Sequence, residues 1–180
     1  MKVTPTELPG VLIIEPKTFR DDRGFFLETF HVDRYRELAH IGLSFVQDNH
    51  SRSTRGVLRG LHLQKRRPQG RLIRVALGDV FDVAADIDPR SPTFGRWVGV
   101  TLSDANHRQL WVPPGFAHGF VVLSDVADVE YKCTDYYDPL SESGVVWNDA
   151  DLAIDWPIDK PTLSAKDQRL PRLAELAAAP

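Results

Sequence analysis

Short apolar segments that alternate with turn-forming residues are the feature that most restricts how this chain can fold. From residue 11 to residue 147, segments rich in Val, Ile, Phe and Trp recur, and Gly, Pro, Asp or Asn separate them. This spacing is typical of the strands of a sandwich or a small barrel. Helical periodicity is scarce, so the predicted fold class is all-β.

The segments that we expect to form strands share this composition. They are residues 11–15, 25–30, 44–50, 56–64, 71–77, 80–87, 96–102, 109–112, 118–123, 129–134 and 144–147. Two other stretches contain helix formers, at residues 33–40 and, interrupted by Pro171, at residues 165–178. No repeat, linker or change in composition divides the chain, so we expect a single domain over residues 1–180, with short helices flanking a β core.

Composition places the chain among ordinary globular proteins. Its 180 residues are 42% hydrophobic and 26% charged. No apolar run approaches the roughly 20 residues that span a bilayer, and the first ten residues lack a basic stretch followed by an apolar one. We therefore expect a cytoplasmic protein without a membrane partner. The only cysteine, Cys133, excludes an intrachain disulfide and is expected to lie in the core.

Charge is distributed unevenly along the chain. Eight Lys or Arg residues and no Asp or Glu lie between Asn49 and Gly78, although the net charge of the chain is −3. This segregation favours a local anion site on an acidic protein, of a size suited to a diphosphate, over a nucleic-acid interface, which more often belongs to a basic domain. The three cations of residues 65–67 precede Pro68 and are more simply interpreted as part of a solvated loop.

Strand alternation predicts which polar side chains face one another. Side chains two residues apart share a face, which places His62 with Gln64, and Arg71 with the apolar side chains of residues 73, 75 and 77. Burying an unpaired guanidinium is costly, so Arg71 is expected to have an acidic partner or to face a polar cavity that binds a ligand. The same rule puts Arg59 on the face opposite His62, unless Gly60 introduces a bulge.

Two motifs resemble those of cupin barrels. One is Gly56, five residues, and then His62-Leu63-Gln64, and the other is Pro-Pro-Gly-Phe-Ala-His at residues 113–118. Metal-binding cupins have a second histidine at the position of Gln64. They also have a glutamate before a glycine, and at these two positions this chain has Arg71 and Gly78. A guanidinium has no lone pair for a metal and repels a cation, so we expect no metal site. What remains is a polar pocket in which a histidine can serve as a base near neutral pH.

Further blocks extend the resemblance from about residue 19 to residue 167. They are FVQDNHSRS (45–53), GVLRGLH (56–62), VFDV (80–83), SPTFG (91–95), RQLWVP (108–113), GFAHGF (115–120) and LSAKD (163–167). Together they closely resemble the dTDP-4-dehydrorhamnose 3,5-epimerase family. The resemblance implies a metal-free cupin fold, a double-stranded β-helix or jelly-roll barrel.

The resemblance also implies a reaction and the residues that carry it out. Members of the family invert C3 and C5 of dTDP-4-dehydro-6-deoxy-D-glucose in dTDP-L-rhamnose biosynthesis, by proton abstraction beside the C4 ketone and reprotonation from the opposite face. No cofactor is implied. By matching motifs, His62 is the base, Asp167 its carboxylate partner and Tyr131 the proton donor. Arg71 stands where the family has lysine: it keeps the positive charge for the enolate but not the compact shape of an ammonium group.

The substrate-binding residues follow from the same matches. Arg23 and Arg59 correspond to the contacts of the diphosphate, and Tyr137 to the aromatic ring that stacks on thymine. The other implied residues are Phe19, Phe26, Glu28, Gln47, Asp48, Asn49, His118, Glu142 and Lys166. The family is dimeric, with strands and binding residues exchanged between subunits, so the resemblance implies a homodimer.

Three alternatives stay open at the level of the sequence. The chain is consistent with an epimerase that acts at C3 or C5 alone on a related dTDP-deoxysugar. A metal-dependent cupin is a second alternative, against which Arg71 argues. A noncatalytic protein that binds a sugar nucleotide is the third, and it would bind ligand without exchanging protons.

Overall fold

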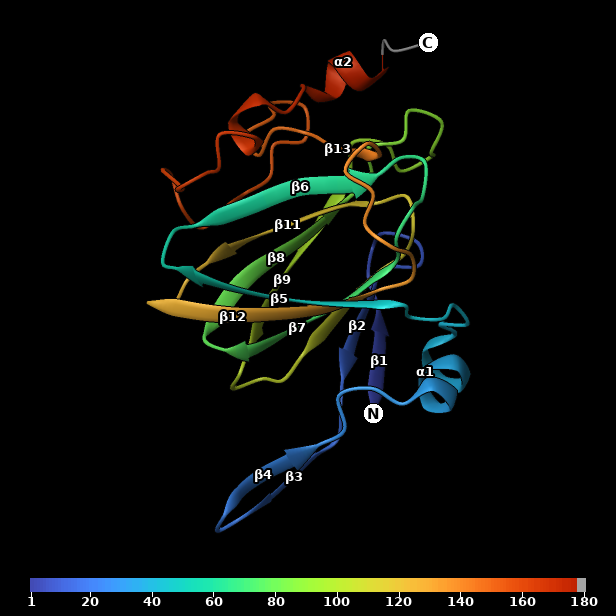
Figure 1. Cartoon of the computed structure of the whole chain (residues 1–180), viewed down its shortest axis with the longest axis vertical. Helices are drawn as coiled ribbons and strands as arrows, with labels where there is room; N and C mark the ends of the chain where they lie inside the picture. The colour runs from blue at the N-terminus through green and yellow to red at the C-terminus, as the bar shows by residue number, and fades with distance from the viewer. Residues whose placement is uncertain (178–180) are drawn as a thin grey trace.

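Two β-sheets face each other and form the body of the protein (Figure 1). The computed structural model describes residues 1–177. The six-stranded sheet contains, in spatial order, β1 (Lys2–Pro5), β2 (Leu12–Glu15), β10 (Gln109–Val112), β7 (Arg71–Leu77), β12 (Val126–Cys133) and β5 (Gln47–Thr54). The five-stranded sheet contains β13 (Glu142–Gly144), β6 (Leu58–Gln64), β11 (Ala117–Val122), β8 (Asp79–Ala85) and β9 (Trp97–Ser103). This is the predicted all-β, cupin-type fold.

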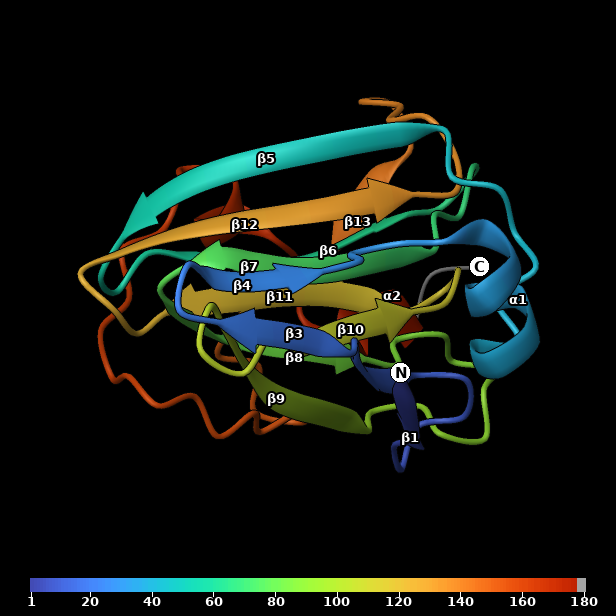
Figure 2. The same ribbon diagram turned by 90° about the horizontal axis from the view of Figure 1, so that it is seen from below.

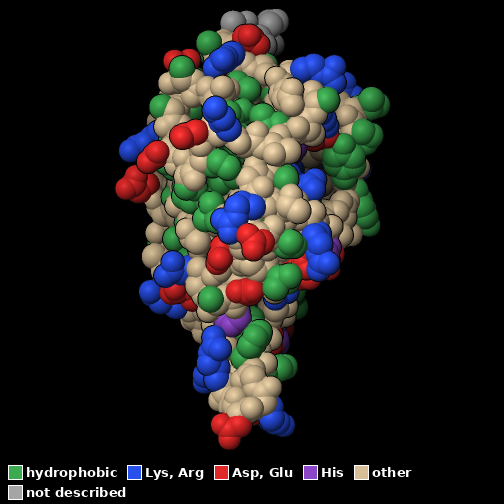
Figure 3. Space-filling view, turned by 90° about the vertical axis from the view of Figure 1, so that its left-hand side faces the viewer, with side chains coloured by type: hydrophobic (Ala, Val, Ile, Leu, Met, Phe, Trp, Pro, Cys, Tyr) green, Lys and Arg blue, Asp and Glu red, His purple; other side chains and the backbone are tan. Residues whose placement is uncertain are grey.

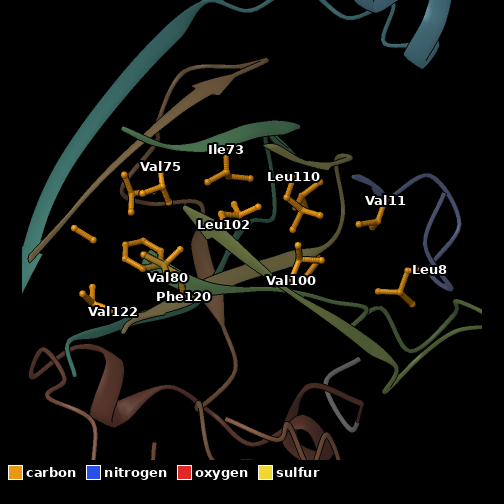
Figure 4. Packing of buried hydrophobic residues seen from close by; sticks show 14 residues of the cluster. Leu8, Val11, Ile73, Val75, Val80, Val100, Leu102, Leu110, Phe120 and Val122 are labelled. Atoms are coloured by element: carbon orange, nitrogen blue, oxygen red, sulfur yellow. The ribbon is translucent and has the colours of Figure 1, made fainter. Parts of the chain in front are cut away.

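The main apolar core fills the space between the two sheets (Figure 4). Ile73 and Val75 enter it from the six-stranded sheet, and Val80, Leu102 and Phe120 enter it from the five-stranded sheet. Each of these side chains is at most 4% exposed. Because alternate residues of a strand point to opposite faces, the residues between them are directed to the outside of the barrel.

Both outer faces of the barrel are covered by other parts of the chain. Helix α1 (Val32–Ala39) places Tyr35 against Leu72 and Trp111 on the outer face of the six-stranded sheet. The segment that follows β13 covers the five-stranded sheet, where Trp156 and Leu173 belong to a second apolar cluster with residues of β6, β8 and β11. The barrel therefore has three apolar layers, and its strands are buried on both faces over much of their length.

A separate hairpin extends from one end of the barrel. It consists of β3 (Thr18–Asp21) and β4 (Gly24–Leu27), which pair only with each other (Figures 1 and 2). In the space-filling view it forms the narrow lower end of the molecule (Figure 3). Phe19 and Phe26 are 52% and 70% exposed on it. Large apolar side chains on a protruding hairpin are typical of a segment that packs against another surface.

A bulge in β6 changes the predicted orientation of Arg59. His118 of β11 pairs with His62, but Phe120 pairs with Arg59, so the one residue of β11 between these pairs lies opposite two residues of β6. The extra residue places Arg59 and His62 on the same inward face, which is the arrangement expected if Gly60 introduces a bulge. The bulge at Gly60 resolves the conflict that alternation alone produced.

A second bulge moves Leu77 out of the barrel. Val129 pairs with Val75, whereas the preceding Asp128 pairs with Leu77, so β7 has one extra residue at this point. Leu77 is 46% exposed, and the prediction that it shares the inward face of Arg71 is wrong.

Several element boundaries differ from those predicted. Strands 71–77 and 109–112 have the expected limits, but β5 continues through polar residues to Thr54 because it pairs with β12 along its whole length. Strands β1 and β3 were not predicted, since each has only four residues. The expected helix at 165–178 is instead a 3₁₀ turn, η1 (Asp167–Arg169), and helix α2 (Leu173–Ala177), separated at Pro171; residue 178 lies outside the described residues. No helix among the described residues is long and apolar enough to cross a membrane.

The bulge at Gly60 predicts a strong preference for glycine. Gly60 has φ +118°, and an added Cβ would lie 2.6 Å from Cα of Gly119 and 2.7 Å from the carbonyl oxygen of His118. We expect Gly60→Ala to lower the free energy of unfolding by about 2–4 kcal/mol, because backbone strain and a backbone clash add together. Urea unfolding of Gly60→Ala beside Gly42→Ala, where a Cβ meets nothing within 4 Å, measures this. Equal stability of the two variants would contradict it.

Candidate active site

A cavity of about 440 Å³ opens between the two sheets at the polar end of the barrel interior. Its wall on the five-stranded side includes His62 and Arg59 of β6, and its wall on the six-stranded side includes Arg71 of β7 and Tyr131 of β12. The remaining lining residues are Ser51, Val57, Leu58, His118, Phe120, Thr162, Leu163, Ser164, Lys166 and Asp167. All four predicted catalytic residues therefore line one cavity.

His62 and Asp167 form the shortest contact between titratable groups that line this cavity. Nε2 of His62 lies 2.6 Å from Oδ1 of Asp167, and the Asp167 side chain is 5% exposed. Burial opposes ionisation of Asp167, but the hydrogen bond with His62 and the bond from Ser164 outweigh it, so the pKa of Asp167 lies below its usual range. A carboxylate only accepts, so Nε2 carries the proton of this bond, and in the neutral imidazole Nδ1 is the nitrogen with the free lone pair.

Tyr131 and Arg71 are neighbours on the opposite wall. Burial raises the pKa of Tyr131, while the charges of Arg71 and Arg59 act in the other direction. Nη1 of Arg71 donates to the carbonyl oxygen of His62 at 3.2 Å, and its Nε is buried without a hydrogen-bond partner in the described part of the chain. Among the residues that the structure describes, Arg71 has no acidic partner, and it meets the second expectation for it, a polar cavity.

His118 lies deeper in the barrel and is paired with an aspartate. Its Nε2 is 2.9 Å from Oδ1 and 3.0 Å from Oδ2 of Asp82, and the side chains of the two residues are 6% and 0% exposed. Asp82 was not predicted as a site residue. The sequence contained a signal for it, because Asp82 lies on the inward face of the apolar run Val80–Val83, and a buried carboxylate requires a partner.

Glu142, Tyr137 and Lys166 form a hydrogen-bonded group at the rim of the cavity. The Tyr137 hydroxyl donates to Oε2 of Glu142 at 2.5 Å, and Nζ of Lys166 donates to the same oxygen. Oε1 of Glu142 lies 4.0 Å from Nδ1 of His62. The bond to Glu142 raises the pKa of Tyr137 to about 12. The structure therefore brings these three predicted binding residues together with the base.

The predicted binding residues of β5 and β6 have different surroundings. Nε of Arg59 donates to Oγ of Ser53 at 3.0 Å, which orients the guanidinium along the cavity wall. Gln47 and Asn49 are joined by a 3.0 Å hydrogen bond. Asp48 alternates with them, is exposed and pairs with Lys132 on the outer face. Asp48 is therefore separated from the cavity that His62 lines.

The predicted binding residues of the hairpin are not brought to the cavity of their own chain. Arg23 is at the tip, pairs with Asp21 and has a side chain that is 90% exposed. Glu28 pairs with Arg34 at the start of α1. Neither these residues nor Phe19 and Phe26 line the cavity, and Figure 1 shows the hairpin at the end of the molecule away from β6.

Ser51 is a further cavity residue that the sequence did not single out. Its Oγ is buried and has no hydrogen-bond partner among the described residues. The alternation of β5 gave the signal, because Ser51 is two residues beyond Asn49 on the same face. Among residues 1–177, no three His, Cys, Asp or Glu side chains are gathered in an arrangement that holds a metal ion.

Comparison with known proteins identifies the family. The model of the dTDP-4-dehydrorhamnose 3,5-epimerase family matches residues 5–175. The chain belongs to this family. It is 56% identical over 170 residues to the dTDP-4-dehydrorhamnose 3,5-epimerase of Pseudomonas aeruginosa, with 94% of each chain covered. A crystal structure of the Legionella pneumophila epimerase in complex with dTDP-4-keto-L-rhamnose matches with a TM-score of 0.93 and 54% identity, covering 97% of this chain and 96% of that one.

Relatives named for inversion at one carbon are less similar. The dTDP-4-dehydrorhamnose 3-epimerase of Streptomyces niveus is 42% identical over 176 residues, which cover 97% of this chain and 85% of that protein. The higher identity to 3,5-epimerases favours inversion at both carbons over the single-site alternative.

Asp167 predicts a pH-dependent contribution to stability. Its pKa is lowered on folding, so its charge stabilises the fold above the usual carboxyl pKa of about 3.9, and this contribution is lost as the pH falls through the lowered value. We expect Asp167→Asn to be less stable than the native chain by about 1–3 kcal/mol at pH 7, with a smaller difference at pH 3. Urea unfolding at both pH values measures this, with Asp155→Asn as an exposed control. A difference independent of pH would contradict it.

Proposed function

We propose that the cavity carries out the family's 3,5-epimerisation with His62 as the base and Tyr131 as the proton donor. In this reaction protons leave C3 and C5 of dTDP-4-dehydro-6-deoxy-D-glucose, the carbons on either side of the C4 ketone, and return on the opposite face. The observation that carries the proposal is the position of the two groups on facing sheets of one cavity, with His62 held by Asp167 at 2.6 Å. Inversion requires a base on one side of the carbon and an acid on the other.

His62 is prepared for proton abstraction by its bond to Asp167. With the proton on Nε2 directed at Asp167, Nδ1 takes the proton from C3, and the electron pair of the C–H bond moves into the enolate of the C4 ketone. The buried carboxylate stabilises the imidazolium that forms, since opposite charges attract strongly where water is excluded. The same step is then repeated at C5.

Tyr131 is suited to return the proton. Burial keeps its hydroxyl protonated near neutral pH because it raises the pKa. When the hydroxyl protonates the enolate carbon, the tyrosinate that remains is stabilised by Arg71 and Arg59 on the same cavity. Proton exchange with solvent restores neutral His62 and neutral Tyr131.

Arg71 is proposed to stabilise the enolate oxygen. Its guanidinium lies between the strands that carry His62 and Tyr131, and its Nε has no hydrogen-bond partner among the described residues. A cation beside the developing oxyanion lowers the barrier to each proton abstraction. Arginine cannot give up its proton, so the role assigned to it is electrostatic only.

Substrate binding is proposed to use the residues of the cavity and its rim. Arg59 would bind the diphosphate, since a guanidinium matches phosphate oxygens. His118 and Lys166 would contact the sugar and its phosphate, and Tyr137 would stack on the thymine base. Gln47, Asn49 and Glu142 lie near Tyr137 and complete this side of the site.

The hairpin residues are proposed to serve the partner subunit of a homodimer. Arg23, Glu28, Phe19 and Phe26 lie on or beside a protruding hairpin that pairs only with itself. Strand β5 is at an edge of the six-stranded sheet and has unpaired backbone groups to offer. A hairpin added to that edge of a second copy would supply these side chains to the neighbouring site. A cytoplasmic location stays a prediction of the sequence.

Deuterium incorporation tests the reaction. When the native chain is incubated with dTDP-4-dehydro-6-deoxy-D-glucose in deuterated water, we expect deuterium at both C3 and C5 by NMR, because each inversion replaces a carbon-bound proton with a solvent proton. In Tyr131→Phe we expect inversion to fall about 10²–10⁴-fold, as for loss of a general acid. Label at one carbon alone would favour the single-site alternative, and no label would favour a binding protein.

Mixed dimers test the exchanged hairpin. We expect Arg23→Ala and His62→Asn each to abolish most activity as homodimers, although Arg23 lies far from its own His62. If the two variants are co-expressed, mixed dimers regain about a quarter to a half of native activity, because one site then has both native residues. The double variant Arg23→Ala/His62→Asn mixed with native chain serves as the control. Failure of the mixture to recover any activity would contradict the exchange.

A further inference from the structure

The loop of residues 134–141 carries Tyr137 without an apolar anchor. It joins β12 to β13, and Tyr136, Tyr137 and Leu140 are 55%, 50% and 82% exposed. In the part of the chain that the structure describes, no side chain of this loop belongs to an apolar cluster. Its position, and therefore that of the Tyr137 ring, depends on hydrogen bonds.

Two glutamine side chains hold consecutive backbone amides of this loop. The N–H of Tyr137 donates to Oε1 of Gln47 at 2.9 Å, and the N–H of Asp138 donates to Oε1 of Gln64 at 3.1 Å. The two bonds fix the peptide groups on both sides of the Tyr137 Cα. A side chain whose flanking peptides are fixed retains only its own rotamers, so its ordering on binding costs less.

The loop of residues 65–70 holds the other half of the same segment. The N–H of Arg66 donates to Oγ of Ser141 at 2.7 Å, and the Arg67 guanidinium forms two bonds of 2.6 and 3.2 Å with the Asp135 carboxylate. Ser141 is 2% exposed. Arg67 is thus an attachment point for the loop of Tyr137, although residues 65–67 are exposed, as expected for a solvated loop.

Gln64 joins this loop to the strand of the base. It follows His62 by two residues on β6, it is 2% exposed, and it stands where metal-binding cupins have their second histidine. It is not among the residues that line the cavity, and its oxygen already accepts from Asp138. Direct contact with the sugar therefore has no support in the structure.

We infer that Gln64 is a positioning residue that fixes Tyr137 for stacking on the nucleotide base of the substrate. The inference rests on the proposed stacking role of Tyr137. Gln64, which stands where metal-binding cupins have a metal ligand, would thereby connect the strand of His62 to the nucleotide site. Loss of the Gln64 acceptor should weaken nucleotide binding only through Tyr137, while the reacting carbons keep their contacts.

A double-mutant cycle on dTDP binding tests this. Calorimetry with dTDP gives Kd for the native chain, Gln64→Met, Tyr137→Ala and the double variant. We expect Gln64→Met to raise Kd about 3- to 10-fold, the effect of one lost hydrogen bond, and to change Kd less than about 2-fold in the Tyr137→Ala background. KM for the substrate should rise with Kd, while kcat changes less than KM.

Two further variants keep the result interpretable. Leu63→Met alters the same strand on its outer face and should leave Kd unchanged. Ser141→Ala removes a hydrogen bond that holds the loop at a different point. We expect it to raise Kd for dTDP when Tyr137 is present and to change Kd little in the Tyr137→Ala background. This variant tests the inference even if Gln64→Met folds poorly.

The outcomes separate this inference from the proposed function. If Gln64→Met raises Kd equally with and without Tyr137, the positioning role of Gln64 is overturned. The same holds if Gln64→Met leaves Kd unchanged while Tyr137→Ala binds dTDP weakly. Both results leave the stacking role of Tyr137 in place. An unchanged Kd in Tyr137→Ala would overturn the stacking role of Tyr137 and this inference with it. Neither result would affect the assignment of His62, which proton exchange tests separately.

Discussion

One extra residue in β6 determines which side chains the barrel encloses. Between Arg59 and His62, one residue of β11 lies opposite two residues of β6, so the side chains of Arg59 and His62 both face inward while Leu58 and Leu61 both face the outer apolar layer. Without the bulge, a guanidinium would enter that apolar layer, where burial of an unpaired charge is costly. The arrangement of the cavity depends on this irregularity, and Gly60 has the backbone conformation and the space that it requires.

The interior of the barrel has an apolar half and a half that contains titratable side chains. In the second half, each histidine is paired with a buried aspartate. Asp167 holds His62, and Asp82 holds His118. Arg71 and Arg59 are the exceptions, because within residues 1–177 neither has an acidic partner, and Nε of Arg71 is unpaired. The resemblance implies a lysine at the position of Arg71 in the family, and the property that Arg71 would share with it is the charge rather than the shape of the group. An unpaired cation in a cavity favours an anionic ligand or an enolate oxygen.

Local rules predicted much of the fold, and the family resemblance predicted the centre of the site. The apolar and turn-residue pattern gave the fold class, and the motifs around His62, Tyr131 and Asp167 indicated residues that the structure gathers in one cavity. Strand alternation failed at Leu77, and it left the side of Arg59 open, because a bulge depends on the partner strand; only at Gly60 did a glycine give a local signal. Asp82 and the loop contacts of Gln64 were missed, since a buried partner becomes visible only when distant strands are placed together.

In the proposed reaction, His62, held by Asp167, removes the protons from C3 and C5. The most direct measurement is deuterium incorporation at both carbons of dTDP-4-dehydro-6-deoxy-D-glucose in deuterated water, with His62→Asn compared with the native chain at equal occupancy by substrate. The account predicts that incorporation at both carbons falls about 10²–10⁴-fold in His62→Asn, the usual effect of losing a general base. Incorporation at the native rate at either carbon in His62→Asn would contradict it.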